Sequence, residues 1–158
     1  MSYSKTRTVQ VAIGERRRPQ PGGKPGYLRV DTVHQGEQTF QYGKGDSAID
    51  VSCLVPTYVC SPCGCEWTGS DAEDIRHDAI CRKLRRLTPH EILDIREQCQ
   101  LSQAEFSRIT GFGEASLSRW ETASQIQNVA CDRLLRLIKA DRRNLDLLRI
   151  MAGGKVVI

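Results

Sequence analysis

The chain has 158 residues, of which 39% are hydrophobic and 27% are charged, so it can hold one ordinary domain or two small ones. No stretch approaches the roughly 18 apolar residues that a membrane-spanning helix needs. The first residues also lack the apolar run of a secretory signal. We therefore expect a soluble cytoplasmic protein with no membrane partner.

The net charge of +4 is distributed unevenly along the chain. Residues 1–30 carry seven Lys and Arg against one acidic residue, residues 31–81 carry two against nine, and residues 82–143 carry twelve against eight. A basic arm and a basic C-terminal half favour a polyanion, with nucleic acid as the first candidate. The acidic middle is expected to avoid the polyanion.

The N-terminal third changes from an irregular to an alternating pattern. The segment ERRRPQPGGKPG is dense in Pro, Gly and Arg and has no apolar period, which predicts a disordered basic arm over residues 1–36. Between Gln38 and Trp67, short apolar alternations flank the Gly-rich turn GKGD, which predicts a β-hairpin. A linker helix is predicted within the segment from residue 69 to residue 87. The hairpin and this linker are expected to form a zinc-ribbon-like region over residues 37–81.

A Cys-x-x-Cys knuckle, YVCSPCG, follows the hairpin and offers Cys60 and Cys63 as zinc ligands. A structural zinc takes four ligands, and this chain contains no second knuckle of this kind. The zinc site is therefore expected to be incomplete. The seven cysteines are odd in number and scattered, which favours reduced thiols over a disulfide framework.

Other donors could complete such a site, and each has a simpler structural interpretation. Cys53 is expected to be a packed strand residue, and Cys65 lies too close to Cys63 for easy tetrahedral closure. Two further sets of donors stay open as possible zinc ligands. They are His34 on the hairpin, and His77 with Cys81, which lie at i and i+4.

The C-terminal half predicts an all-α domain over residues 82–143, followed by a tail over residues 144–158. Thr88 with Pro89 and Ser102 with Glu105 are helix start signals. Apolar residues recur at helical spacing and are expected to share one core: Ile92, Ile95, Leu101, Ala104, Phe106, Ile109, Leu117, Trp120, Leu134, Leu135, Leu137 and Ile138. Cys99 and Cys131 are expected to be small core or boundary residues. The fold class predicted for the whole chain is α+β.

Two short helices meet at TGFGE, which is the spacing of a helix-turn-helix. The segment LSQAEFSRITGFGEASLSRWE resembles the DNA-binding domain of Cro/repressor-type (XRE-like) regulators. The resemblance implies that a helix from about Glu114 to Thr122 enters the major groove of double-stranded DNA. The side chains expected to reach DNA are Glu114, Ser116, Ser118 and Arg119 from this helix and Gln103, which meets the phosphate backbone. Glu121 is expected to pair with an internal Arg.

The hairpin, the knuckle and the helices together resemble the MqsA/YgiT-type antitoxins over residues 37–140. The resemblance implies a non-enzymatic repressor of the type II toxin-antitoxin kind that dimerises on a palindromic operator and regulates its own operon. It also implies zinc as a cofactor and a toxin as a partner, usually an mRNA-cleaving ribonuclease. Members of the family usually begin with a first Cys-x-x-Cys pair, where this chain has YLRVDTVHQG.

The first 36 residues resemble a short stretch of DDE-type transposases or integrases. In those proteins a strand such as YLRVDTVH presents the first catalytic aspartate, here Asp31. One aspartate cannot hold the two-metal site that phosphoryl transfer requires, so the resemblance implies a remnant. A transposition-related DNA-binding protein remains the alternative function.

Overall fold

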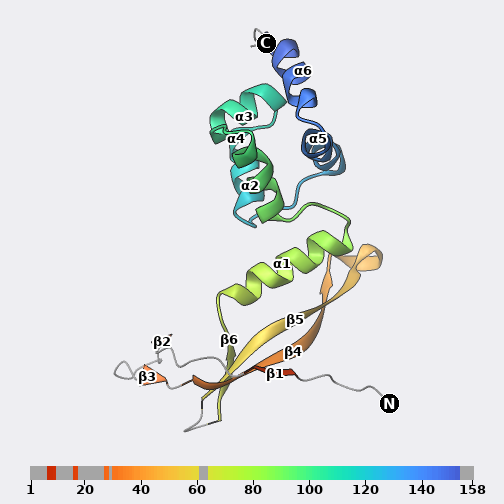
Figure 1. The fold of residues 1–158 in the computed structure, drawn as a ribbon. Coiled ribbons are helices and arrows are strands. Elements are labelled where there is room, and N and C mark those ends of the chain that lie inside the picture. Colours follow the sequence, from red (N-terminus) through yellow and green to blue (C-terminus); the bar gives the residue numbers. More distant parts are fainter. Residues whose placement is uncertain (1–6, 10–15, 18–26, 29, 61–63, 154–158) are drawn as a thin grey trace. The chain divides into compact units, whose positions relative to one another are not determined.

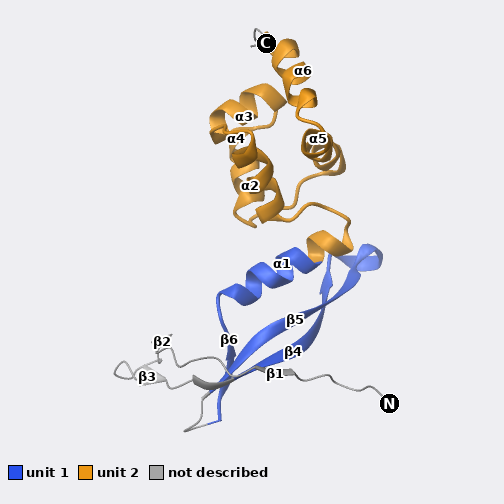
Figure 2. Ribbon diagram, in the orientation of Figure 1, with its two compact units in different colours: residues 1–79 blue, residues 80–158 orange. Residues whose placement is uncertain are grey.

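The computed structural model describes residues 7–9, 16–17, 27–28, 30–60 and 64–153. It divides into two compact units, residues 1–79 and residues 80–158 (Figure 2). The first unit carries the strands and the second carries most of the helices (Figure 1). None of the described helices is both long enough and apolar enough to cross a membrane.

The strands of the first unit form an antiparallel sheet in the order β1-β4-β5-β6. Its members are β1 (Arg7–Val9), β4 (Val30–Tyr42), β5 (Ile49–Cys60) and β6 (Glu66–Thr68). A second sheet pairs β2 (Arg16–Arg17) with β3 (Tyr27–Leu28), and a 3-10 turn (Gly45–Ser47) lies between β4 and β5.

The β4–β5 hairpin confirms the predicted hairpin, and its alternating sequence explains its two faces. Phe40 pairs with Val51 and Gly36 pairs with Val55, and both valines are buried. The intervening residues Ser52 and Leu54 point to the other face and are exposed. One face of the hairpin is therefore apolar and covered, and the opposite face is exposed at Ser52 and Leu54.

The first strand of the hairpin starts earlier than predicted. β4 begins at Val30, and Arg7–Val9 pair with Val33–Gln35, although both segments were predicted to belong to a disordered arm. Strand pairing uses backbone N–H and C=O groups and so does not require an apolar period in the sequence. Arg16–Arg17 and Tyr27–Leu28 of the predicted arm also pair with each other, as β2 and β3, and residues 1–6, 10–15, 18–26 and 29 lie outside the described residues.

The linker helix α1 (Asp71–Lys83) is present where the sequence predicted it. Its first turn carries acidic residues and its last turn carries Arg82 and Lys83, which suits the helix dipole. The Arg76 guanidinium donates two hydrogen bonds to Gln38 Oε1 on β4, at 3.2 and 2.8 Å. Gln38 shares the face of Val51 and Val55, so α1 covers the apolar side of the hairpin.

The helices after α1 are α2 (Pro89–Gln98), α3 (Gln103–Thr110), α4 (Glu114–Glu121), α5 (Val129–Ala140) and α6 (Arg143–Met151). Both predicted start signals are confirmed as capping boxes. Thr88 caps α2 with Glu91 as its reciprocal partner, and Ser102 caps α3 with Glu105. These caps satisfy backbone N–H groups that have no partner within the helix.

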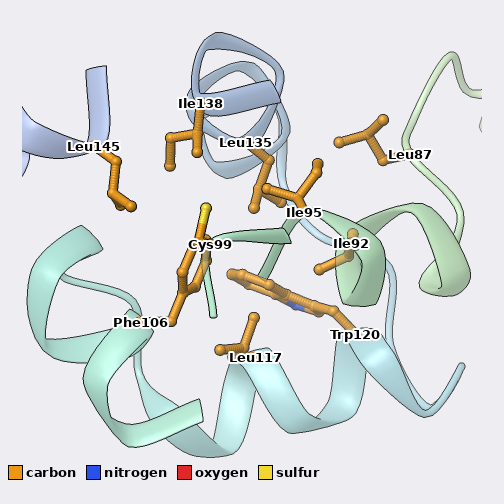
Figure 3. Close-up of a cluster of buried hydrophobic side chains, with 10 residues drawn as sticks. All are labelled: Leu87, Ile92, Ile95, Cys99, Phe106, Leu117, Trp120, Leu135, Ile138 and Leu145. Carbon is orange, nitrogen blue, oxygen red and sulfur yellow. The ribbon is translucent and has the colours of Figure 1, made fainter. Parts of the chain in front are cut away.

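One apolar cluster holds the second unit together (Figure 3). Its buried members are Leu87, Ile92, Ile95, Cys99, Phe106, Leu117, Trp120, Leu135, Ile138 and Leu145. Leu101, Ile109, Cys131 and Leu134 pack against it as partly buried residues. The prediction is wrong for two core residues, because Ala104 and Leu137 are exposed. Leu137 lies two positions after the buried Leu135 and therefore on the opposite side of α5.

Helix α6 occupies the region that was predicted to be a tail. Leu145 joins the apolar cluster, and Leu148 packs against it. Arg142 donates a hydrogen bond to the Gln98 carbonyl at the end of α2. The helical unit therefore extends to residue 151, beyond the boundary expected at residue 143.

Substitution of neighbouring residues on α5 tests this core. Ile138 is 1% exposed and Leu137 is 54% exposed. Ile138→Ala is expected to lower the free energy of unfolding by about 2–5 kcal/mol, because it leaves a cavity in a packed cluster. Leu137→Ala is the matched control and should change it by no more than about 0.5 kcal/mol. Chemical denaturation measures both, and equal losses would contradict the core assignment.

Candidate functional site

The turn between α3 and α4 is built from two glycines with different tasks. Gly111 ends α3 in the left-handed conformation, with φ 76°, which only glycine adopts without strain. Gly113 precedes α4 in extended conformation and accepts the amide hydrogens of Ser116 and Leu117. The chain thus changes direction within three residues, and two short helices meet at a fixed angle.

Phe112 holds this turn against the core, a role that sequence reasoning missed. Its ring lies 5.2 Å from the ring of Trp120 in an edge-to-face arrangement and 6.3 Å from that of Phe106. The sequence feature that could have revealed this role is an aromatic residue between two turn-forming glycines. Because Phe106 belongs to α3 and Trp120 to α4, this one side chain ties both helices to their connection.

The outward face of α4 carries three of the predicted DNA-contacting residues. Glu114 and Arg119 are exposed and Ser118 is partly exposed. Glu114 and Ser118 lie four residues apart and so share one side of the helix, and Arg119 lies about 100° further round from Ser118, also away from the core. Leu117 and Trp120 occupy the opposite side and are buried. In the described part of the chain, the Arg119 side chain forms no ion pair. Its guanidinium therefore keeps all its donors available.

The other two predicted residues lie beside this face rather than on it. Ser116 is partly buried and lies over the turn, where its Oγ would be 3.4 Å from a Cβ at Gly113. Gln103, the first residue of α3, donates from Nε2 to Glu121 Oε2 at 2.7 Å. One of its amide hydrogens is thus committed to the protein.

Glu121 pairs with an internal arginine, as predicted. Arg96 on α2 donates from Nε to Glu121 Oε1 at 2.7 Å and from Nη2 to Oε2 at 3.0 Å. The carboxylate is only 4% exposed. A third donation, from Arg96 Nη1 to the Leu101 carbonyl at 3.0 Å, holds the connection between α2 and α3. One ion pair therefore joins three helices around the α3–α4 turn.

This pairing also fixes the charge of the site. The hydrogen bond to Glu121 raises the pKa of Arg96 above its usual value, although burial acts in the opposite direction. Arg96 thus remains a cation whose charge is neutralised internally. The uncompensated positive charge at α4 belongs to Arg119, which stands outside this pair.

The candidate zinc ligands fall at the edge of the described structure. Cys60 is the last residue of β5, its side chain lies outside the described part, and Cys63 lies wholly outside it. Among the described residues no group of three or more His, Cys, Asp or Glu could hold a metal ion. That includes His77 and Cys81 on α1, which find no third donor of this kind.

Strand geometry separates the remaining donors. Cys53 and Cys60 lie seven residues apart on one continuous strand, which places them roughly 23 Å apart. Sulfurs on one zinc ion lie within about 4 Å of each other, so Cys53 cannot share a zinc with Cys60. His34 faces Thr57, three positions from Cys60 and so roughly 10 Å away along the strand.

Cys65 is the donor that the register brings closest. Val59 pairs with Glu66, and Cys60 directly follows Val59 while Cys65 directly precedes Glu66, so both cysteines adjoin the last pair of the β5–β6 ladder. Sequence reasoning set Cys65 aside because of its closeness to Cys63. Its position beside the β5–β6 ladder makes it a better candidate than Cys53 or His34.

A family model described as the antitoxin component of a bacterial toxin-antitoxin system, MqsA, matches residues 30–151. The chain belongs to the MqsA antitoxin family. The match begins at the first residue of β4 and ends at the last residue of α6, so it covers the hairpin and all the helices of this MqsA-family chain. The predicted span of 37–140 was therefore too short at both ends.

The transposase-like resemblance lies mostly ahead of this match. Asp31 is within β4 and within the span of the MqsA model, and its side chain lies outside the described part of the chain. No curated protein and no solved structure matches the chain.

Proposed function

We propose that this MqsA-family antitoxin is a sequence-specific DNA-binding repressor that regulates its own operon. The observation that carries the proposal is the outward face of α4, where Glu114, Ser118 and Arg119 lie together on a helix placed by a tight turn. A helix that follows another helix after a short turn, and is held in place by that turn, can enter the major groove as the second helix of a helix-turn-helix.

Each side chain on this face has a chemistry suited to a base or a phosphate. Arg119 can donate two hydrogen bonds to guanine O6 and N7, and Glu114 can accept from the amino group of cytosine. Ser118 suits either a base or a phosphate, as does Ser116 at the border of the face. Gln103 stands at the start of α3 and can use its second amide hydrogen for a phosphate, while Glu121 holds the first.

A second copy of the chain is the partner that best fits α6. Leu145 and Leu148 face the core, while Leu147, Ile150 and Met151 are exposed at i, i+3 and i+4, with Met151 83% exposed. The same helix carries the ion pair of Arg149 with Asp146 at its flank. Repressors with a helix-turn-helix read two half-sites as a two-fold dimer, so an apolar stripe that pairs with itself supplies the needed interface.

A basic toxin is the partner proposed for the first unit. Residues 31–81 carry two basic residues against nine acidic ones, and the exposed face of the hairpin includes Glu37 and Asp50. In the described part of the chain, β1 pairs only with Val33–Gln35, so the outer edge of β4 from Gly36 to Tyr42 keeps unpaired backbone groups. Such an edge, surrounded by negative charge, suits a cationic ribonuclease better than it suits DNA.

Cys60 and Cys63 are proposed as zinc ligands of an incomplete site. The chain has no second Cys-x-x-Cys pair, and the position of Cys65 directly before β6 supports it as an additional donor near Cys60. Zinc, when fully ligated, would stabilise the hairpin end without taking part in catalysis.

The alternative is a transposition-related DNA-binding protein, suggested by the segment around Asp31. It uses the same α4 face but a different partner, because a catalytic subunit would replace the toxin. A ribonuclease-like reading frame beside the gene supports the antitoxin, whereas flanking inverted repeats with a split transposase support the alternative.

DNA binding by full-length Arg119→Ala tests the proposed repressor. Loss of a bidentate base contact is expected to cost about 1–3 kcal/mol on the cognate operator and far less on random DNA. Arg133→Ala removes an exposed cation from α5 and serves as the charge-matched control. Fluorescence anisotropy at one fixed salt concentration gives both affinities. Equal losses on the two DNAs would assign Arg119 to the phosphates.

The oligomeric state of Leu147→Glu with Met151→Glu tests the α6 interface. Two buried carboxylates would face each other across a two-fold axis, so a monomer is expected where the wild-type chain is a dimer. Val129→Glu adds one carboxylate at an exposed apolar position in the first turn of α5 and should leave the dimer intact. Sedimentation equilibrium reports the mass, and a dimer that persists in the α6 variant rules out this interface.

Metal analysis of the purified chain tests the zinc site. We expect well below one tightly held zinc per chain, since a structural site needs four ligands. A full equivalent that is lost in Cys65→Ser and retained in Cys53→Ser would show that Cys65 completes the site. The proposal of an incomplete site would then be wrong, while the preference for Cys65 over Cys53, which follows from the β5–β6 pairing, would be supported.

A further inference from the structure

The connection between α1 and α2 contains a strained residue. α1 ends in a Schellman motif, in which Arg86 N–H donates to the Cys81 carbonyl at 2.7 Å and Arg85 N–H donates to the Arg82 carbonyl at 3.0 Å. Arg85 takes the left-handed position of this motif, with φ 56°. Glycine is the usual residue there, because a side chain in this conformation meets its own backbone.

The residues that follow are held by side chains from much later in the chain. Leu87 N–H donates to Asp132 Oδ1 at 2.7 Å, and the Leu87 carbonyl accepts from Gln127 Nε2 at 2.9 Å. Both polar backbone groups of Leu87 are therefore satisfied across a separation of 45 and 40 residues. The Leu87 side chain is itself part of the apolar cluster.

The holding group is a buried and fully bonded carboxylate. Asp132 and Gln127 are each 3% exposed, and Gln127 Nε2 also donates to Asp132 Oδ1 at 3.0 Å. Arg136 donates to the second oxygen at 2.8 Å and reaches the Arg85 carbonyl at 3.3 Å. Burial acts to raise the pKa of Asp132, but hydrogen bonds from Arg136, Leu87 and Gln127 together hold it below its usual value.

We propose that Asp132, Gln127 and Arg136 form a latch that holds the strained connection at residues 84–88 against the helical unit. The connection carries Arg85 and Arg86, so its release presents an extended basic segment to any protease that cleaves after arginine. Loss of the latch frees Leu87, and the strain at Arg85 favours the open form. This device concerns the connection alone and does not depend on DNA binding.

Limited trypsin digestion of the full-length chain, with cleavage sites identified by mass spectrometry, tests the latch. In Asp132→Asn, cleavage after Arg86 is expected to rise about tenfold or more, since hydrogen bonds to a buried charge are lost and cleavage follows the population of the open form. Cleavage after Arg96, whose side chain is largely buried in its ion pair, should rise much less. Asp141→Asn removes an exposed ion pair with Arg143 and should change neither rate.

A second substitution separates strain from simple instability. Arg85→Gly relieves the left-handed backbone, so the double variant Asp132→Asn with Arg85→Gly should recover several-fold of the lost protection after Arg86. If the double variant is cleaved as fast as Asp132→Asn, backbone strain at Arg85 makes no contribution to the opening of the connection. Equal acceleration after Arg86 and Arg96, or no acceleration at all, would overturn the latch.

A milder variant covers the case in which Asp132→Asn does not fold. Gln127→Leu leaves the pair of Asp132 with Arg136 and the bond from Leu87 N–H to Asp132 in place, and removes the two bonds that Gln127 Nε2 donates to the Leu87 carbonyl and to Asp132 Oδ1. Hydrogen exchange at the Leu87 amide should accelerate in this variant while amides within α2 keep their protection. Uniform acceleration across α2 would show that Gln127 stabilises the whole unit and that no separate latch exists.

Discussion

The ion pair between Arg96 and Glu121 is the interaction on which the α3–α4 arrangement depends. Glu121 is at the end of α4, Arg96 is on α2, and Gln103 adds a third contact from the start of α3. A carboxylate this deeply buried costs several kcal/mol to remove from water, and only a full set of donors offsets that cost. Removing one partner of such a pair typically costs about 3–5 kcal/mol, so the three helices can take one arrangement and no neighbouring one.

The same physical solution appears a second time in the helical unit. The Asp132 side chain is as buried as that of Glu121. Both carboxylates accept from an arginine and a side-chain amide, and Asp132 also accepts from the backbone N–H of Leu87. The first carboxylate fixes helices against each other, and the second fixes the connection that leads into α2. Both are long-range contacts, which lets a unit of five short helices keep a single geometry.

The two units differ in charge, which agrees with the proposal that each unit binds a different partner. In the first unit, residues 31–79 carry two basic residues against nine acidic ones, and among the described residues the edge of β4 from Gly36 to Tyr42 has no strand partner. The second is basic, and its exposed Arg119 lies outside every ion pair in the described residues. Membership of the MqsA antitoxin family fits this division, because an antitoxin of this kind must address a protein partner and, as proposed, DNA.

Sequence alone determined the elements whose signals are local: the capping boxes at Thr88 and Ser102, the alternation of the hairpin, and the exposed position of Arg119 on a short helix. Tertiary structure alone decided which polar groups meet, because Glu121 with Arg96 and Asp132 with Leu87 are separated by 25 and 45 residues. Register likewise separated Cys65 from Cys53, and packing buried Ile138 while exposing Leu137. Capping and periodicity act within a few residues, whereas these pairings exist only once the helices and strands have packed.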